Sequence, residues 1–543
     1  MISITPQGQI YLCKTPLEND YKNQLTFSTK ANQLTYFNST IQKTFDNYTY
    51  IKKDNIIKVG CNIDEIIDCN YLFYQNTGFT NKYYFCFITG MEYINENCTA
   101  ISFVTDVFQT WQFDIVYKKC FIEREHVNDD SIGLHTIPEN VETGEPIAQS
   151  VSTMDYGTFY PCVAVSDDIL RSDETTYHHN YNGVVSGLTY IALKESSDVN
   201  YFIFRYNQAG KIDAISSIFM IPDDYLPSSG WVTDSTGLVH YKYITEKTTP
   251  FEIGTLDLLK PSILGEGNIG YTPKNKKLLT FPYCYILADN NTGANVIYRY
   301  EDFTAPDGAT ANTIRFKCIG TINAGCSIKY VPVNYKNIGE NYNESFNGAK
   351  LPLGGWINDV YTNWLRQNGL NIAINTAGSI LQIVGGVGLA GTGAGGVSGA
   401  GQIASGITGI ASTIGQIYQH SLIPNQAEGN INSSDIMFSA GKVGCSLYQM
   451  SLKIEYLKVI DSFFSMFGYK VNSVKTPNIT GRPNWNYVKT IDCNFDGNIP
   501  QQDLDIIKSM FNKGVTLWHH ANTMYDYGQA NELSNNNVII APE

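Results

Sequence analysis

The stretch from Gln367 to Ala427 contains no Asp, Glu, Lys or Arg, and this limits what the chain can fold into. Its two flanks carry apolar or small residues at alternating spacings of four and three, a pattern typical of helices. Between the flanks about half of the residues are glycine, and each glycine costs a helix roughly 1 kcal/mol relative to alanine. The pattern predicts a helical hairpin with a flexible tip.

Two sets of residues define this predicted hairpin. The apolar set is Ile372, Ile380, Leu381, Ile383, Val384, Val387, Leu389, Val397, Ile403, Ile407, Ile410, Ile414 and Ile417. The glycine set, which forms the tip, is Gly385, Gly386, Gly388, Gly391, Gly393, Gly395, Gly396, Gly399 and Gly401.

Lipid is the environment that suits this hairpin when it is exposed. A spanning helix needs about 20 apolar residues, and one arm supplies fewer before glycine interrupts it. Small residues spaced four apart let helix backbones approach closely in lipid. A buried hairpin or a linker is the alternative, but flexible linkers are polar and exposed apolar segments associate in water. We therefore expect a segment that is hidden in one state and enters lipid when released.

The composition predicts a mainly β protein. A chain of 543 residues exceeds one ordinary core and indicates two to four domains. Its 37 Tyr and 26 Phe, among many Asn, Thr and Ile residues, favour strands and turns. The net charge of −14 argues against nucleic acid as a gripped ligand. DNA remains possible as passing cargo, since an acidic wall would repel it.

The cysteines and the first residues indicate folding in a reducing cytoplasm. The twelve cysteines are scattered without a C-x-x-C pair, so neither a zinc site nor a compact disulfide framework is expected. Residues 1–11 lack a basic region followed by an apolar core, and no secretory signal is expected.

Short strands dominate the predicted secondary structure. In the first third, β-branched and aromatic runs separated by turn residues predict a barrel or sandwich. Trp111, Phe113 and Ile115 alternate with polar residues and read as a half-buried strand. Further strands are expected at residues 160–165, 188–193, 201–206, 281–287, 296–300 and 314–322.

Two clusters of polar residues are candidates for a catalytic or a metal site. Glu123 and Glu125 flank Arg124 and precede His126, and alternation would place both carboxylates on one face of a strand. Such charged pairs more often serve an interface or a solvated surface. Adjacent histidines at 178 and 179 would point to opposite faces of a strand, which favours surface histidines over a metal site.

No cofactor is expected from the motifs. Two G-x-G-x-x-G matches fall in the glycine-rich tip, where the uncharged run supplies no acidic residue for a dinucleotide fold.

The residues Asp492, Asn494, Asp496, Asn498 and Asp503 match positions of a calcium loop, although the preceding segment reads as strand. A polar turn with Asp503 near a helix N-terminus is the alternative. No nucleophile elbow, Walker loop or zincin motif occurs, and the chain is not expected to be an enzyme.

Several blocks carry a family resemblance. They are residues 19–23, 106–115 and 121–127 near the start, and 468–472 and 514–519 near the end. In these blocks the sequence resembles the tail knob, or distal tail tube, proteins of small short-tailed Picovirinae-type phages of Gram-positive bacteria. The resemblance implies a hexamer that forms the distal end of the virion tail together with other tail proteins. It also implies a hydrophobic loop that plugs the tube and later perforates the host membrane.

Both ends of the chain carry the resemblance, so the expected architecture is a tube with insertions. Residues 1–150 and 433–543 are expected to form tube-building β-barrel domains, 151–345 an inserted β-rich knob domain, and 346–432 the apolar loop. One alternative is a receptor-binding tail protein for the host cell wall, whose loop is only a plug. A wall hydrolase with acid and base residues from distant segments is the weaker alternative.

Overall fold

The structure is a computed structural model of the chain. It describes residues 7–48, 55–76, 81–154, 159–170, 179–181, 184–186, 188–223, 226, 230–244, 251–266, 270–291, 293–322, 326–348, 353–355 and 444–533. Two compact units are present: unit 1 comprises Met1–Gly144, Tyr271–Leu278 and Ile454–Glu543, and unit 2 comprises Glu145–Gly270 and Leu279–Lys453. The chain therefore passes between the units four times.

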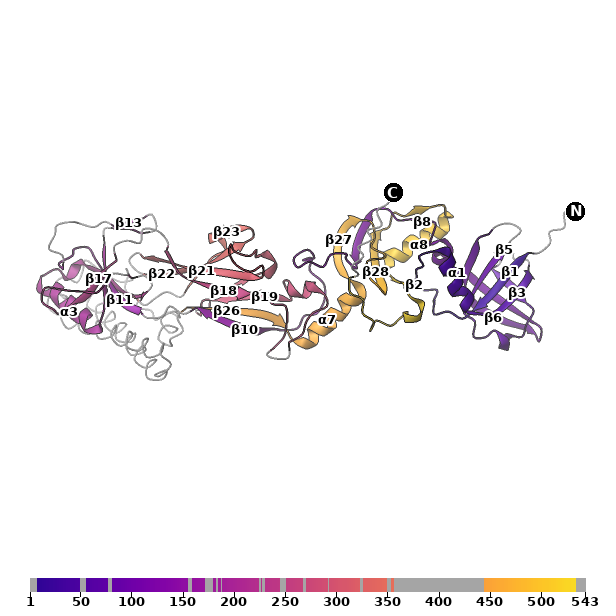
Figure 1. The fold of residues 1–543 in the computed structure, drawn as a ribbon, viewed down its shortest axis with the longest axis horizontal. Coiled ribbons are helices and arrows are strands. Elements are labelled where there is room, and N and C mark those ends of the chain that lie inside the picture. The colour runs from indigo at the N-terminus through magenta and orange to yellow at the C-terminus, as the bar shows by residue number, and fades with distance from the viewer. Residues whose placement is uncertain are drawn as a thin grey trace, which may run out of the picture. The chain divides into compact units, whose positions relative to one another are not determined.

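The N-terminal part of unit 1 is a six-stranded antiparallel sheet with the order β3-β1-β5-β6-β7-β4. Figure 1 shows most of its strands in indigo and violet. Within the described residues its path is open, with β3 and β4 as the end strands. The strands are β1 (Gly8–Cys13), β3 (Ile41–Tyr48), β4 (Ile56–Val59), β5 (Tyr71–Asn76), β6 (Tyr83–Asn95) and β7 (Cys98–Thr105).

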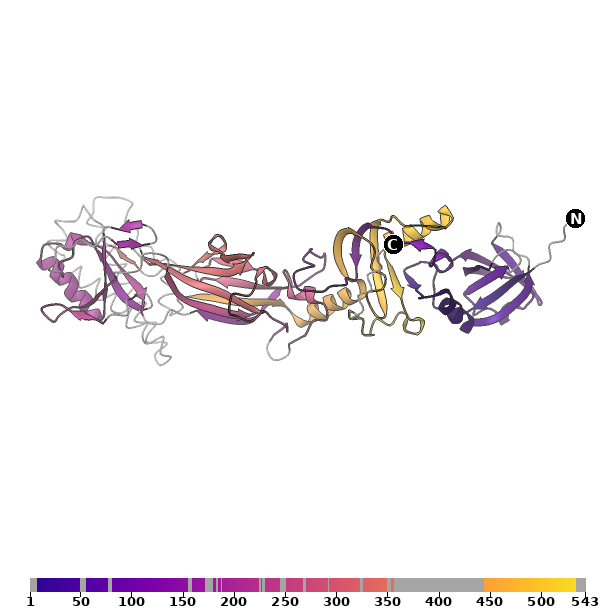
Figure 2. The ribbon, with the colours of Figure 1, turned by 45° about the horizontal axis from the view of Figure 1, so that its top comes forward.

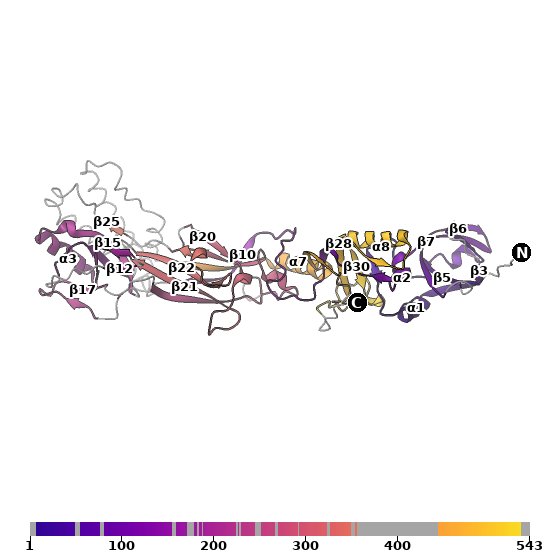
Figure 3. The same ribbon diagram turned by 90° about the horizontal axis from the view of Figure 1, so that it is seen from above.

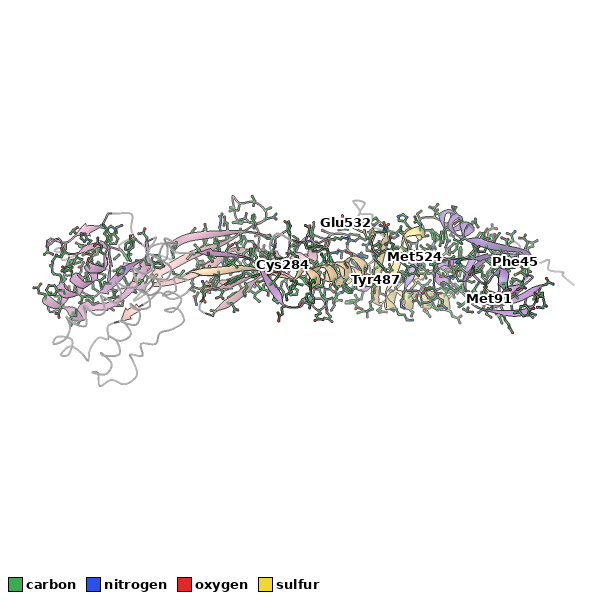
Figure 4. All side chains as sticks on the ribbon, turned by 90° about the horizontal axis from the view of Figure 1, so that it is seen from below. Phe45, Met91, Cys284, Tyr487, Met524 and Glu532 are labelled. Carbon is green, nitrogen blue, oxygen red and sulfur yellow. The ribbon has the colours of Figure 1, made fainter. Side chains whose placement is uncertain are left out.

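Side chains alternate along these strands and supply two cores. Leu72 and Cys86 lie in a core with Phe45, against which Met91 packs; Figure 4 labels the last two. The neighbouring residues of β5 and β6 point the opposite way, because successive side chains of a strand alternate between faces. They enter a second core that also contains Trp485 and Trp518 from the C-terminal part of the chain.

The C-terminal part of unit 1 shares a mixed sheet with N-terminal segments. Its order is β2-β30-β28-β9-β27, and β2 runs parallel to β30. Helix α8 lies beside β28 and β30, as Figure 3 shows from above. The elements are β2 (Asn23–Leu25), β9 (Cys120–Glu125), β27 (Tyr469–Lys475), β28 (Trp485–Asp492), β30 (Val515–Trp518), the paired β8 (Ile115–Val116) and β29 (Asp496–Gly497), and helices α1 (Lys30–Ser39), α2 (Val107–Trp111), α7 (Ile454–Phe467) and α8 (Gln501–Lys513).

Unit 2 contains three larger sheets and a small hairpin. The sheet orders are β10-β26-β19-β20, β16-β17-β14-β11-β15-β25 and β18-β21-β22-β23, with β24 also paired to β22. Figure 2 shows the purple β10 and orange β26 side by side, although they are about 300 residues apart in sequence.

The elements of unit 2 follow in chain order. They are β10 (Pro146–Met154), β11 (Phe159–Val165), β12 (His179–Tyr181), β13 (Val184–Ser186), β14 (Thr189–Leu193), α3 (Ser196–Gln208), β15 (Ile215–Pro222), β16 (Val232–Thr233), β17 (His240–Tyr243), β18 (Phe251–Leu259), β19 (Cys284–Asp289), β20 (Asn295–Tyr298), β21 (Thr313–Ile322), β22 (Cys326–Tyr335), β23 (Ile338–Glu340), β24 (Phe346–Asn347), β25 (Leu353–Gly355) and β26 (Cys445–Leu452).

Aromatic side chains join two of these sheets. Tyr298 of β20 is fully buried, and its ring centre lies 5.1 Å from that of Phe316 in β21 and 5.3 Å from that of Tyr335 in β22. Both contacts are edge-on, an arrangement that stabilises aromatic pairs beyond their burial. The β10-β26-β19-β20 sheet is therefore packed against the β18-β21-β22-β23 sheet.

Two predicted strands are wrong. At the first, with Trp111, Phe113 and Ile115, helix α2 ends at Trp111, a turn follows, and only Ile115 begins a short strand, β8. Asp106 decides this difference, because its side chain accepts a hydrogen bond from the Gln109 amide at 3.1 Å and caps the helix.

The second is the strand predicted at 201–206, which lies inside helix α3. Val199, Phe202, Ile203 and Tyr206 are all fully buried at the i, i+3, i+4, i+7 spacing of one helical face. The aromatic and β-branched content of this segment favoured a strand, and packing of that face overrode the preference.

Candidate functional site

The uncharged segment leaves the described fold of unit 2 at an edge strand. Strand β25 pairs antiparallel with β15, and the register places Gly355 opposite Ser217 and Leu353 opposite Phe219. β25 is the last strand in its sheet order. The chain that leads to the uncharged segment is thus fixed at residues 353–355 by backbone pairing with a buried strand.

The chain returns through a central strand. β26 pairs with β10 on one side and with β19 on the other. Its side chains at Cys445, Leu447 and Leu452 are buried, and the Gln449 amide donates to the Leu259 carbonyl at 2.9 Å. Figure 4 labels Cys284, the first residue of the neighbouring β19. Both attachment points of the segment therefore belong to unit 2.

The predicted membrane-active residues themselves, from Ile372 to Ile417 with the tip glycines, lie outside the described residues. The hairpin and its contact with lipid accordingly stay predictions. Among the helices that the structure describes, none is both long and apolar enough to cross a membrane.

A short segment from the middle of the chain is fixed onto helix α7 of unit 1. The Asp461 carboxylate, which is buried, accepts hydrogen bonds from the Tyr271 hydroxyl at 2.6 Å and from the Lys274 and Asn275 backbone amides at 2.8 and 3.0 Å. The Asn275 side-chain amide donates to the same carboxylate at 2.7 Å. The Asp461 side chain thus holds residues 271–275, which belong to the segment that joins the two halves of unit 2.

A buried ionic cluster fixes the same segment a second time. Lys277 donates to the Glu139 carboxylate at 2.5 Å, and both side chains are almost fully buried. Arg124 forms a second ion pair with Glu139, and the Lys470 backbone amide donates to it at 2.9 Å. Burial lowers the pKa of Lys277, and the neighbouring Glu139 opposes this shift. Removal of one partner would leave a buried charge unpaired, which is strongly destabilising.

The carboxylates and histidine of β9 have structural partners. Glu123 pairs with Lys489 at 2.9 Å, and the buried Glu125 pairs with Lys475 and accepts from the Asn478 amide at 2.9 Å. Burial raises the pKa of Glu125. Both carboxylates thus form ion pairs within unit 1, and Glu125 lies in the interior rather than on the solvated surface that the sequence favoured.

His126 is held neutral by its surroundings. Its Nδ1 accepts from the Tyr487 amide at 2.8 Å, so Nε2 carries the proton and donates to the Ser465 carbonyl at 3.0 Å. Burial, followed by the charge of Arg482, lowers the pKa of His126 to about 3. The neutral ring of His126 uses both nitrogens in hydrogen bonds to the backbone, one at Tyr487 and one at Ser465, and so links these two segments to the end of β9.

The residues of the possible calcium loop also have contacts of their own. Asp496 pairs with Lys118 at 2.8 Å, and Asp503, in the first turn of α8, accepts from the Trp111 indole at 2.8 Å. Within the described part of the chain, no cluster of three or more His, Cys, Asp or Glu side chains is arranged to hold a metal ion. The contact to Asp503 agrees with the alternative of a carboxylate near a helix N-terminus, and calcium binding stays untested.

Blocks that carried the family resemblance at the two ends of the chain meet at one pocket in unit 1. The pocket has a volume of about 420 Å³, and Asp20, Tyr21, Lys22 and Asn23 line it together with Gly514 and other C-terminal residues. Figure 4 labels Tyr487, which also lines it. The two ends of the sequence thus build one structural feature.

Comparison with known proteins places this architecture in a family. Residues 241–532 match the family model of the C-terminal domain of the tail knob protein gp9 of Bacillus phage phi29. The chain belongs to the tail knob protein family. Residues 9–118, which hold the six-stranded sheet, match a second family model, that of the N-terminus of caudoviral major tail proteins.

Similarity to tail knob proteins extends over nearly the whole chain. The tail knob protein gp9 of Bacillus phage B103 is 26% identical over 95% of this chain and 97% of its own length. The corresponding protein of Bacillus phage PZA is 26% identical over 96% of this chain and 98% of its length. The solved structure of the tail knob protein gp12 of bacteriophage C1 shares the fold with a TM-score of 0.63, at 14% identity, over 97% of this chain.

Membership in the family confirms the resemblance found in the sequence and the mainly β fold. The protein is a structural component of the phage tail, located at its distal end. Sequence reasoning missed two features of the fold: the 271–278 segment that belongs to unit 1, and the anchoring of the uncharged segment by β25 and β26. In the sequence, unit 1 gives way to unit 2 after residue 144 and resumes at residue 454. The predicted tube domains instead end at residue 150 and resume at residue 433.

Proposed function

We propose that this tail knob protein assembles into a closed ring, a hexamer, that forms the end of the tail tube and conducts DNA during ejection. The acidic composition of the chain supports passage of DNA without tight binding, since like charges repel. Closed rings are the common way in which identical subunits bury matching surfaces. Other tail proteins of the virion are the expected neighbours.

We further propose that the segment 346–432 closes this tube before infection and inserts into the host cell membrane after release. One observation carries this proposal: the uncharged run of residues from Gln367 to Ala427 lies between two strands of unit 2, β25 and β26, that are fixed by backbone hydrogen bonds. An insertion anchored at both ends can leave its storage site without disturbing the β-sheets. Several hairpins together could build a pore, because helices satisfy their backbone polar groups in lipid.

Dye release from liposomes tests the membrane role. The full chain is compared with a variant in which Leu370 to Ile417 is replaced by a short polar linker. Leakage from the full chain alone is the expected result. Equal leakage from both proteins would contradict the proposal, and absence of leakage with retained blockage of the tube would favour a plug in a receptor-binding protein.

A matched pair of variants tests the proposed helical arm. The isoleucines from Ile403 to Ile417 form an apolar stripe at helical spacing. The substitutions Ile403→Lys and Ile410→Lys place a charge on this stripe, whereas Gln402→Lys and Thr408→Lys place it beside the stripe. A charge at the centre of a membrane helix costs about 3 kcal/mol on insertion scales. We expect the stripe variants to reduce leakage at least tenfold and the off-stripe variants to reduce it less. Equal losses would argue against an amphipathic arm.

A further inference from the structure

Two cysteines from distant parts of the chain face each other in the shared sheet of unit 1. The last register pair of β9 and β28 is Phe121 with Asp492. In an antiparallel ladder the next pair outward joins the residue before Phe121 to the residue after Asp492, and these are Cys120 and Cys493. Facing residues of antiparallel strands have Cα atoms about 4.5–5.5 Å apart, inside the range of roughly 4.4–6.8 Å that a disulfide requires.

A thiol–thiol contact supports the register independently. The two thiols influence each other's ionisation, and the Cys493 side chain and the Asn494 backbone amide are the groups that favour the ionised form of Cys120. These two groups lower the pKa of Cys120, and the contact with Cys120 raises the pKa of Cys493. Cys120 and Cys493 are 4% and 5% exposed, and both are reduced in the structure. A thiol of lowered pKa beside a thiol of raised pKa is typical of reactive cysteine pairs.

We propose that Cys120 and Cys493 form an oxidation site, at which a peroxide converts the two thiols into a disulfide that joins the N-terminal and C-terminal parts of unit 1. The bond would close a loop of about 370 residues that contains unit 2. The protein folds with both thiols reduced, and the bond forms when the assembled protein meets an oxidising medium.

The reaction balances with hydrogen peroxide as the two-electron oxidant. The Cys120 thiolate attacks one peroxide oxygen, the O–O bond breaks, and the released hydroxide takes up a proton to become water. The Cys493 thiol then gives its proton to the leaving hydroxyl of the Cys120 sulfenic acid. Its sulfur forms the S–S bond, and a second water leaves. Hydrogen peroxide is small enough to reach a sulfur that is only slightly exposed.

Mass spectrometry of the full chain tests this proposal. The reduced protein is treated with graded hydrogen peroxide, its remaining thiols are alkylated under denaturing conditions, and peptides are separated without reductant. The expected result is a linked Cys120–Cys493 peptide as the first oxidation product, with a melting temperature several degrees above that of the reduced protein. Dithiothreitol should reverse the shift, and the Cys493→Ala variant should not show it.

Cys61 and Cys69 provide an internal control. They lie between β4 and β5 as buried thiols of one core cluster, and burial raises the pKa of both. We expect the Cys120–Cys493 peptide to appear at least tenfold faster than any Cys61–Cys69 peptide. Equal rates for the two pairs, or oxidation of other cysteines while Cys120 and Cys493 stay unlinked, would overturn the proposal.

Discussion

At the scale of single residues, Asp106 shows how burial links structure to pH. The carboxyl is fully buried, accepts from the Tyr71 hydroxyl at 2.9 Å and caps helix α2. Burial raises its pKa from 3.8 to about 7, although the hydrogen bonds it accepts oppose this shift. The folded protein therefore retains a proton that the unfolded chain releases at lower pH.

The Asp106→Asn variant tests this pKa. Because the folded state holds the proton more tightly, stability from Asp106 is complete below about pH 4 and falls as the pH rises to about 7. Asparagine does not titrate, so the variant lacks this loss. Relative to the wild type, we expect the variant to gain up to about 4 kcal/mol of unfolding free energy between pH 4 and pH 8. Urea titrations of both proteins measure the gain, and a constant difference would contradict the raised pKa.

At the scale of elements, helix α7 positions a segment that sequence alone did not assign to it. Leu457, Ile460, Asp461 and Phe464 form its buried face at helical spacing. Three of these residues are apolar, and the carboxylate in their row is the one that receives Tyr271 and the following backbone amides. The one polar residue on the buried face of α7, Asp461, therefore binds a segment from elsewhere in the chain, residues 271–275.

The Asp461→Ala variant tests this function of α7. Loss of the carboxylate leaves buried amide donors unpaired, and each costs about 1–3 kcal/mol. We expect unit 1 to lose about 3 kcal/mol or more, with faster hydrogen exchange at residues 271–278. Asp505→Ala is the matched control, since the exposed Asp505 on α8 accepts a hydrogen bond from the Gln501 side chain of the same helix. Similar losses in both variants would refute this function.

At the scale of the whole molecule, two tryptophans connect the ends of the sequence within unit 1. Trp485 and Trp518 are fully buried, and their ring centres lie 5.0 Å apart. They pack in one core with Tyr71 and Phe85 of the N-terminal sheet, and the Trp518 indole donates to Asn23 at 3.0 Å. The stability of the N-terminal sheet thus depends on residues near the end of the chain.

The Trp518→Ala variant tests this dependence. Removing a buried tryptophan costs about 3–5 kcal/mol, and we expect faster hydrogen exchange in β5 and β6 as well as in β30. Trp231→Ala, in unit 2, is the control, and it should leave exchange in unit 1 unchanged. Protection of β5 and β6 that survives the loss of Trp518 would show that the N-terminal sheet is stable without the C-terminal segment.

The sequence by itself determined the family, the mainly β class and several strands, among them β11, β14 and β21, because these depend on local patterns. Both the alternation of side chains along a strand and the blocks shared with tail knob proteins lie within short stretches of consecutive residues. Two helices escaped local analysis, because a capping carboxylate at Asp106 and the buried face of α3 outweighed the strand preference of their residues.

Only the tertiary structure decided which distant segments meet. The pairing of β10 with β26, the attachment of 271–278 to Asp461 and the pairing of Phe121 with Asp492 all join residues far apart in sequence. No local pattern encodes such partners, since backbone hydrogen bonds and buried contacts form with whatever segment the folded chain brings near. The apolar character of the uncharged segment follows from its residues alone. The strands on either side of it, β25 and β26, were identified only from their pairing in the folded chain.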